Sequence, residues 1–190
     1  VSGWANATGR RRAGRTGAVG QCLQEGDGVT GMGARGKWVA PGLIDVRAQL
    51  GVYPSPGVGA NRGGNGMTAP VTANGWAEHS VWPQDPGFGA ALAGGITTLQ
   101  ILPGSANLVG GRGVTLKNVA ATTVQDMKFP GAPYGLKMAC GENPKRVYGE
   151  KGGPATRMGN VAGHRAALID AAEYRRKQAG GSPGKRDIKL

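Results

Sequence analysis

Residues that bind metals or carry out covalent catalysis are scarce in this sequence. Its 190 residues include 2 histidines, 2 cysteines and 11 acidic residues, and aromatic residues make up 5% of the chain. Cys22 and Cys140 lie far apart and match no zinc or redox spacing, so they indicate neither a metal site nor a disulfide. A metal site built from imidazole or thiolate ligands of this chain alone is therefore not expected.

Long apolar runs are also missing. A membrane-spanning helix needs about 18 or more consecutive apolar residues, and no run in the sequence approaches that length. No charged and then apolar leader opens the chain, which begins with Val1 rather than Met. The sequence predicts no membrane span, and its start fits either a processed product or an incompletely known beginning.

Glycine and proline, in contrast, are abundant. The 37 glycines and 12 prolines together make up about a quarter of the chain, at the edge of the range typical of low-complexity sequence. Apolar residues, at 39%, are sparse for a self-contained globule. Because the glycines follow no repeat and interrupt apolar segments, we expect a loop-rich α/β protein with many tight turns.

The net charge of +12 is concentrated at the two ends of the chain. Residues 1–40 contain six Lys or Arg against two acids, residues 41–140 six against four, and residues 141–190 eleven against five. Basic ends can bind nucleic acid, but they also occur on solvated tails and helix faces. No aromatic residue lies within the basic run at residues 9–15, which disfavours a stacking surface for single strands.

Two regions differ in character. Residues 1–35 form a basic, Gly- and Arg-rich segment with little periodicity, which we interpret as a residual β element. From residue 36 onward, strand and helix patterns alternate around a long loop at residues 51–75, and the predicted elements are strands at 37–46, 96–105 and 135–144 and helices at 85–95 and 159–181. This alternation favours parallel strand pairing in an α/β architecture.

Local signals support several of these elements. The strand at 37–46 is a continuous apolar run, typical of burial on both faces. Asp85 is a predicted N-cap of the first helix, with Pro86 in its first turn. The last helix has an apolar stripe and a favourable i,i+4 ion pair; the stripe is Val161, Leu168, Ile169 and Ala172, and the pair is Glu173 and Lys177.

The stretch GKWVAPGLIDV at residues 36–46 resembles the entry to the first barrel strand of the amidohydrolase superfamily, where a Pro-Gly-x-Ile-Asp step precedes a His-x-His pair. Segments at residues 94–118, 135–149 and 154–160 are similar to the imidazolonepropionase-like branch of that superfamily. The resemblance covers residues 36–190 and implies that they form part of a (β/α)₈ barrel.

The same resemblance implies a metal site at the carboxyl ends of the strands and hydrolysis of an amide or cyclic amide. The two histidine positions that follow Asp45 are occupied by Arg47 and Gln49. Arginine keeps its proton and cannot ligate a metal, and glutamine offers only a weak carbonyl oxygen. Asp45, Arg47 and Gln49 therefore form a degenerate motif.

Two residues remain as metal candidates within the resemblance. Lys137 resembles the lysine that some members carboxylate to bridge two metals, and Glu142, at the mouth of the same strand, is another oxygen donor. The alternatives are a lysine that snorkels at a strand end and a carboxylate that caps the turn after it. A divalent metal such as zinc is expected only where a partner chain supplies further ligands; His79 and His164 are expected to be structural or solvated.

The glycine-rich loop at residues 103–113 matches neither the dinucleotide nor the Walker spacing. A loop of this kind after a strand can cradle an anion with its backbone N–H groups. Within the resemblance it is a substrate-side loop at the barrel mouth, with Asn107 and Arg112 as its polar contacts.

A complete barrel needs about 250 residues, and we expect this chain to supply about three or four of the eight strands. An open sheet exposes unpaired backbone and an apolar face, so we expect a second chain or self-association to complete it. The predicted function is that of an amidohydrolase-like protein, inactive alone or one part of a multi-chain enzyme. The alternative is a non-enzymatic interaction protein whose basic ends bind an acidic partner or nucleic acid.

Overall fold

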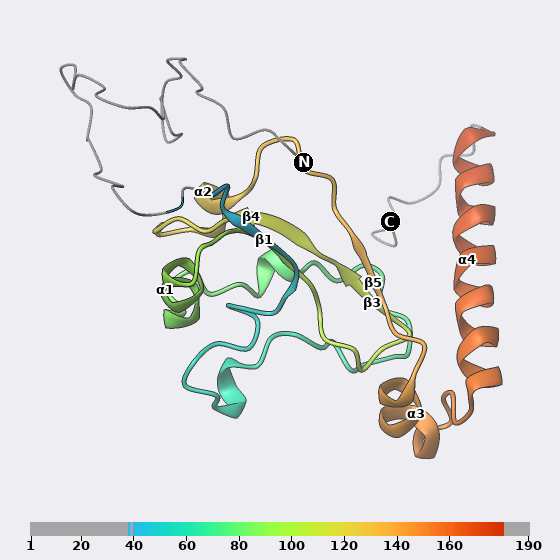
Figure 1. Ribbon diagram of the computed structural model, residues 1–190. Coiled ribbons are helices and arrows are strands. Elements are labelled where there is room, and N and C mark those ends of the chain that lie inside the picture. Colours follow the sequence, from blue (N-terminus) through green and yellow to red (C-terminus); the bar gives the residue numbers. More distant parts are fainter. Residues whose placement is uncertain (1–37, 39, 181–190) are drawn as a thin grey trace, which may run out of the picture. The chain divides into compact units, whose positions relative to one another are not determined.

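The computed structural model describes residue 38 and residues 40–180 (Figure 1). The chain divides into two units, Val1–Pro41 and Gly42–Leu190, and all but three of the described residues belong to the second. The predicted amino-terminal segment, residues 1–35, lies outside the described residues, as do the basic residues beyond position 180.

The second unit is a mixed α/β structure. Its elements in chain order are β1 (Leu43–Ala48), α1 (Pro86–Ala93), β2 (Ile96–Ile101), β3 (Val109–Arg112), β4 (Val114–Lys117), α2 (Val124–Met127), β5 (Leu136–Met138), α3 (Glu142–Tyr148) and α4 (Arg157–Ala179). Short 3₁₀ turns lie at Gly59–Asn61, Ala77–His79 and Gly149–Lys151. No helix within the described ranges is long and apolar enough to cross a membrane.

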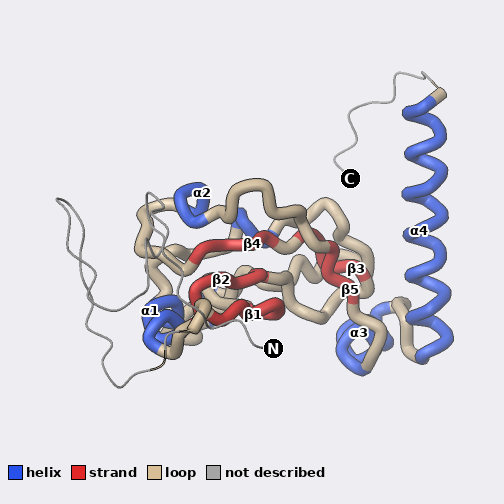
Figure 2. Tube along the Cα trace, turned by 45° about the horizontal axis from the view of Figure 1, so that its top comes forward, coloured by secondary structure: helices blue, strands red, loops and turns tan. Residues whose placement is uncertain are grey.

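The strands form two small sheets, and Figure 2 shows β1, β2 and β4 side by side. β1 and β2 are parallel and are joined through α1, which confirms the predicted strand-helix-strand unit. β2 and β4 are antiparallel, and so are β3 and β5, which corrects the expectation of parallel pairing. The physical reason is that the segment between β2 and β4 contains no helix to serve as the crossover that a parallel pair requires.

The core lies around β2 and β4. Leu99 and Ile101 of β2 pair with Leu116 and Val114 of β4, and all four side chains are buried. Their alternation with half-buried residues along both strands matches the period of two expected for a sheet with one buried face. The remaining buried members of the cluster come from β1, α1, α2 and the loops: Ala48, Val52, Ala77, Phe88 and Met127.

β1 differs from its prediction. The continuous apolar run indicated burial on both faces, whereas Leu43, Ile44 and Val46 are 59%, 67% and 69% exposed. The reason is that β1 is an edge strand in the described part of the chain, with β2 as its single neighbour. A strand added at the free edge of β1 would pair with its backbone, and elements packed on the two sheet faces would cover these side chains.

The buried carboxylate of Asp85 ties the loop after β1 to the first helix. As predicted, Asp85 caps α1, and its Oδ1 accepts a hydrogen bond from the Gly87 N–H at 3.0 Å. It also accepts from the Gly51 N–H at 2.8 Å and from the Ser55 N–H at 3.2 Å. Three backbone donors satisfy this carboxylate, which offsets the cost of burying it.

The longest helix, α4, is attached to the rest of the unit through its first half. Asn160 Nδ2 donates to the backbone oxygens of Cys140 and Gly141 at 3.0 and 2.9 Å. His164 Nε2 lies 3.0 Å from the Leu108 carbonyl oxygen and is buried. His164 thus has a structural role, as expected from the sequence.

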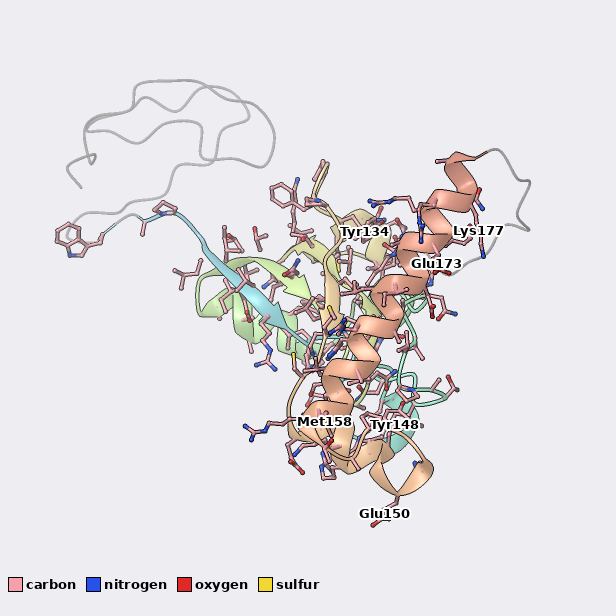
Figure 3. The ribbon with its side chains drawn as sticks, turned by 90° about the vertical axis from the view of Figure 1, so that its right-hand side faces the viewer. Tyr134, Tyr148, Glu150, Met158, Glu173 and Lys177 are labelled. Atoms are coloured by element: carbon pink, nitrogen blue, oxygen red, sulfur yellow. The ribbon has the colours of Figure 1, made fainter. Side chains whose placement is uncertain are left out.

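Two predicted features of α4, its apolar stripe and its ion pair, differ in the structure. The apolar stripe remains exposed, with Val161 at 56%, Leu168 at 57% and Ile169 at 53%. Glu173 lies 3.8 Å from Arg176 rather than pairing with Lys177, and Figure 3 shows Glu173 and Lys177 on the part of α4 farthest from α3. Both side chains of the observed pair are exposed, so it contributes little to stability.

Replacing Asp85 by alanine tests the role of its carboxylate in the fold. We expect Asp85→Ala to lower the free energy of unfolding by about 2 to 4 kcal/mol, since it removes a helix cap and leaves the buried N–H of Gly51 without an acceptor. Chemical denaturation measures this change. Glu150→Ala, which removes an exposed carboxylate, is the matched control and should change stability by less than about 0.5 kcal/mol. Equal effects of the two substitutions would contradict the assigned role.

Candidate functional site

Two predicted site residues converge on one backbone carbonyl. Lys137 Nζ, on β5, donates to the Pro103 carbonyl oxygen at 3.0 Å, and Gln49 Nε2 donates to the same oxygen at 3.4 Å. Gln49 follows β1 and Pro103 follows β2. Burial and the positive charge of Arg47 both lower the pKa of Lys137. We therefore call Arg47, Gln49 and Lys137 the strand-end cluster.

The electrostatics of the strand-end cluster are those of like charges. Burial lowers the pKa of Lys137 below its ordinary value of 10.5, and the positive charge of Arg47 lowers it further. Lys137 is 9% exposed, and its ammonium group donates a hydrogen bond to the Pro103 carbonyl. This cluster therefore concentrates positive charge at the strand ends.

These residues do not fit a divalent metal ion. Arginine and a protonated lysine have no lone pair to give, and the amide nitrogen of Gln49 donates rather than ligates. Within residues 38 and 40–180, no group of three His, Cys, Asp or Glu side chains lies close enough together to hold a metal. The strand-end cluster by itself provides a cationic environment where the family resemblance implies metal ligands.

Asp45 and Glu142 are engaged elsewhere. Asp45 Oδ1 accepts from the backbone N–H of Arg47 at 2.9 Å, a local turn-like contact. Glu142 begins α3, and its Oε2 lies 3.0 Å from Lys145 Nζ, with the Glu142 side chain 70% exposed. His79, with an exposed side chain, lies 3.6 Å from Glu78. None of these three side chains forms a hydrogen bond or ion pair with Lys137.

Asn107 connects three segments of the unit instead of facing a cavity. It is 1% exposed, its Nδ2 donates to the Gly66 carbonyl at 2.8 Å and to Thr72 Oγ1 at 2.5 Å, and its Oδ1 accepts from the Tyr148 hydroxyl at 2.7 Å. These bonds hold the loop at residues 66–72 against α3. Asn107 is therefore a buried structural residue that holds this loop in place.

Arg112 stacks on an aromatic ring. Its guanidinium carbon lies 4.4 Å from the centre of the Trp76 ring, and the rings of Trp76 and Tyr134 meet edge to face with 4.8 Å between their centres. The backbone N–H of Arg112 also donates to the Gly75 carbonyl at 2.7 Å. The sequence predicted Asn107 and Arg112 as polar contacts of one substrate-side loop. In the structure their side chains contact different residues.

Sequence reasoning missed a small polar cavity beside Gln49. It has a volume of about 250 Å³, and its walls come from the loop after β1, the loop after β2 and α3; the lining residues are Gln49, Tyr53, Asn65, Met67, Gly104, Ser105, Ala106, Asn143, Arg146 and Val147. Gly104, in the predicted substrate loop, was the available signal, because an added Cβ there would clash with the side chains of Tyr53 and Asn65.

No family model matches the sequence. The fold is similar to the crystal structure of an amidohydrolase from Thermotoga maritima MSB8, with a TM-score of 0.80 and 37% sequence identity, covering 90% of this chain and 45% of that one. The sequence is also similar to the amidohydrolase tasK of Hapsidospora irregularis, 34% identical over 160 residues, covering 76% of this chain and 16% of that protein.

The chain spans less than half the length of both relatives, so it represents one part of each. The similarity nevertheless extends over most of the present chain in both sequence and structure. It agrees with the motif at residues 36–46 that first indicated this relationship. The chain is related to the amidohydrolase superfamily.

Proposed function

We propose that this chain is an amidohydrolase-like part of a barrel that does not hydrolyse amide bonds by itself and acts together with a further polypeptide, either a second chain or a second copy. The observation that carries the proposal is the convergence of Lys137 and Gln49 on the Pro103 carbonyl, with Arg47 acting on Lys137. A metal-activated water has no protein ligands there. Related chemistry would require the missing donors from the partner.

The exposed apolar residues of β1 support the second half of the proposal. Leu43, Ile44 and Val46 are more than half exposed on an edge strand. Such an edge invites pairing with another strand. In the Thermotoga maritima amidohydrolase, the region similar to this chain is 45% of the whole.

The metal half of the proposal is tested by zinc content. We expect the purified chain to retain clearly less than one zinc per molecule and to show no hydrolysis of simple or cyclic amides, since the strand-end cluster is cationic. The double variant Arg47→His and Gln49→His should gain zinc affinity, because it supplies two neutral imidazoles in place of a charge and an amide. Elemental analysis after dialysis measures both.

A matched control keeps the number of added histidines constant. Arg62→His together with Arg165→His places two imidazoles at exposed positions far apart in the sequence and should leave the zinc content unchanged. Equimolar zinc in the unmodified chain would overturn the proposal that the strand-end cluster excludes a metal.

The like-charge interaction within the strand-end cluster makes a separate prediction. Removing the guanidinium in Arg47→Ala should raise the pKa of Lys137 part of the way toward 10.5, while burial keeps it below that value. An NMR titration of the Lys137 side chain measures the change. Arg165→Ala, which removes an exposed cation from α4, is the control. A Lys137 pKa that does not move in Arg47→Ala would show that the two charges do not interact.

The association half of the proposal is tested at β1. We expect the full chain to self-associate or to bind a partner, and the variant Val46→Glu to weaken that association at least about tenfold, because a charge on an edge strand opposes strand pairing. Analytical ultracentrifugation measures the mass. Val119→Glu places the same charge at another exposed apolar residue, 44% exposed, and should not affect association. A stable monomer that finds no partner would refute this half.

A further inference from the structure

We propose that the polar cavity between α3 and the loops after β1 and β2 binds a small molecule through an oxyanion, such as a carboxylate. The cavity lies beside Gln49 and is lined by Tyr53, Ser105, Asn143 and Arg146 among others. This inference does not depend on the proposed association or on the absence of metal. It concerns a binding site that shares only Gln49 with the strand-end cluster.

Arg146 supplies the charge. It is exposed on α3, lines the cavity, and forms no ion pair with any described residue. The carboxylate nearest to it along α3, Glu142, has Lys145 as its partner at 3.0 Å. A guanidinium with free N–H groups at the edge of a cavity is suited to two parallel hydrogen bonds with an oxyanion.

Two hydroxyl groups in the walls have a hydrogen left to donate. The Tyr53 oxygen accepts from Asn65 Nδ2 at 2.5 Å, and the Ser105 oxygen accepts from Asn143 Nδ2 at 2.6 Å. Neither hydroxyl donates to another described residue. Burial raises the pKa of Tyr53, although Asn65 and Arg62 oppose the change, so its hydroxyl remains protonated at neutral pH.

The amide side chains in the walls are held in fixed orientations. Asn65 Oδ1 accepts from the Ala106 N–H at 3.1 Å, which leaves Asn65 Nδ2 directed at Tyr53. The Gly104 N–H donates to the Gly64 carbonyl at 2.6 Å, so the two loops touch through their backbones. An added Cβ at either glycine would lie about 2.3 Å from Tyr53, and this close approach positions the hydroxyl before any ligand arrives.

The charge balance of the cavity selects the ligand. Its lining contains one guanidinium, three amides and two hydroxyls but no carboxylate. The neighbouring strand-end cluster adds the positive charges of Arg47 and Lys137, and Gln49 belongs to both groups. The charged side chains around the cavity repel a cation, whereas an oxyanion would find a positive charge and two hydroxyl donors. The volume of about 250 Å³ suits a ligand of few heavy atoms.

The experiment is an NMR titration of the full chain with acetate and, separately, with inorganic phosphate at constant ionic strength. We expect saturable shifts confined to the side-chain signals of Asn143 and Arg146 and the backbone signals of Ser105. Saturation by acetate alone identifies a carboxylate ligand, and saturation by phosphate identifies a phosphate ester or free phosphate. Either result supports the oxyanion site, and no saturable shift with either anion overturns it.

Variants separate a specific site from general attraction by a basic protein. Arg146→Gln should weaken binding at least about tenfold, and Tyr53→Phe should weaken it less, because it removes one neutral donor and keeps the ring. Arg165→Gln removes one exposed positive charge from α4 and should leave the affinity unchanged. Equal losses in Arg146→Gln and Arg165→Gln would overturn the proposal. The unshifted signals of the β2 and β4 core report that each variant remains folded.

Discussion

The buried carboxylate of Asp85 is the interaction on which the arrangement of this unit depends. Its hydrogen bonds to the N–H groups of Gly51 and Ser55 enclose the segment that carries Tyr53, and its bond to Gly87 begins α1. One side chain therefore links the strand-helix-strand unit to the wall of the polar cavity. Because a buried carboxylate requires all its donors, the loop cannot move without loss of stability.

A reversal of charge distinguishes the strand ends from those implied by the family resemblance. Histidines on a first strand would bind a cation, whereas Arg47 and Lys137 repel one and share their surroundings with the hydrogen-bonding Gln49. The cavity next to them continues this character, with Arg146 and no carboxylate in its lining. The fold is similar to that of the Thermotoga maritima amidohydrolase, and our proposals give its strand ends and the adjacent cavity an anionic ligand in place of a metal ion.

Local signals were sufficient for some elements and insufficient for others. The Asp85 cap and the extent of α4 depend on neighbouring residues, so pattern and spacing predicted them within a few positions. The exposure of Val46 depends on whether a strand lies beside β1, which no local pattern records. The cavity escaped prediction because its walls meet through pairs such as Asn143 and Ser105, 38 positions apart. Family resemblance singled out Gln49 and Lys137 separately, and their convergence on the Pro103 carbonyl was not predicted.

The attachment of α4 has a mechanical consequence. Its 23 residues make a rod about 35 Å long at about 1.5 Å per residue. The hydrogen bonds of its side chains to the rest of the unit come from Asn160 and His164, near one end. Because α4 is attached near one end, a change in its tilt displaces the other end most. A tilt of about 10° at His164 would move the last turn by about 4 Å. The carbonyl groups of Cys140, Gly141 and Leu108 are thus the points about which α4 would tilt. A small displacement of these carbonyls would produce a larger displacement at the far end of the helix.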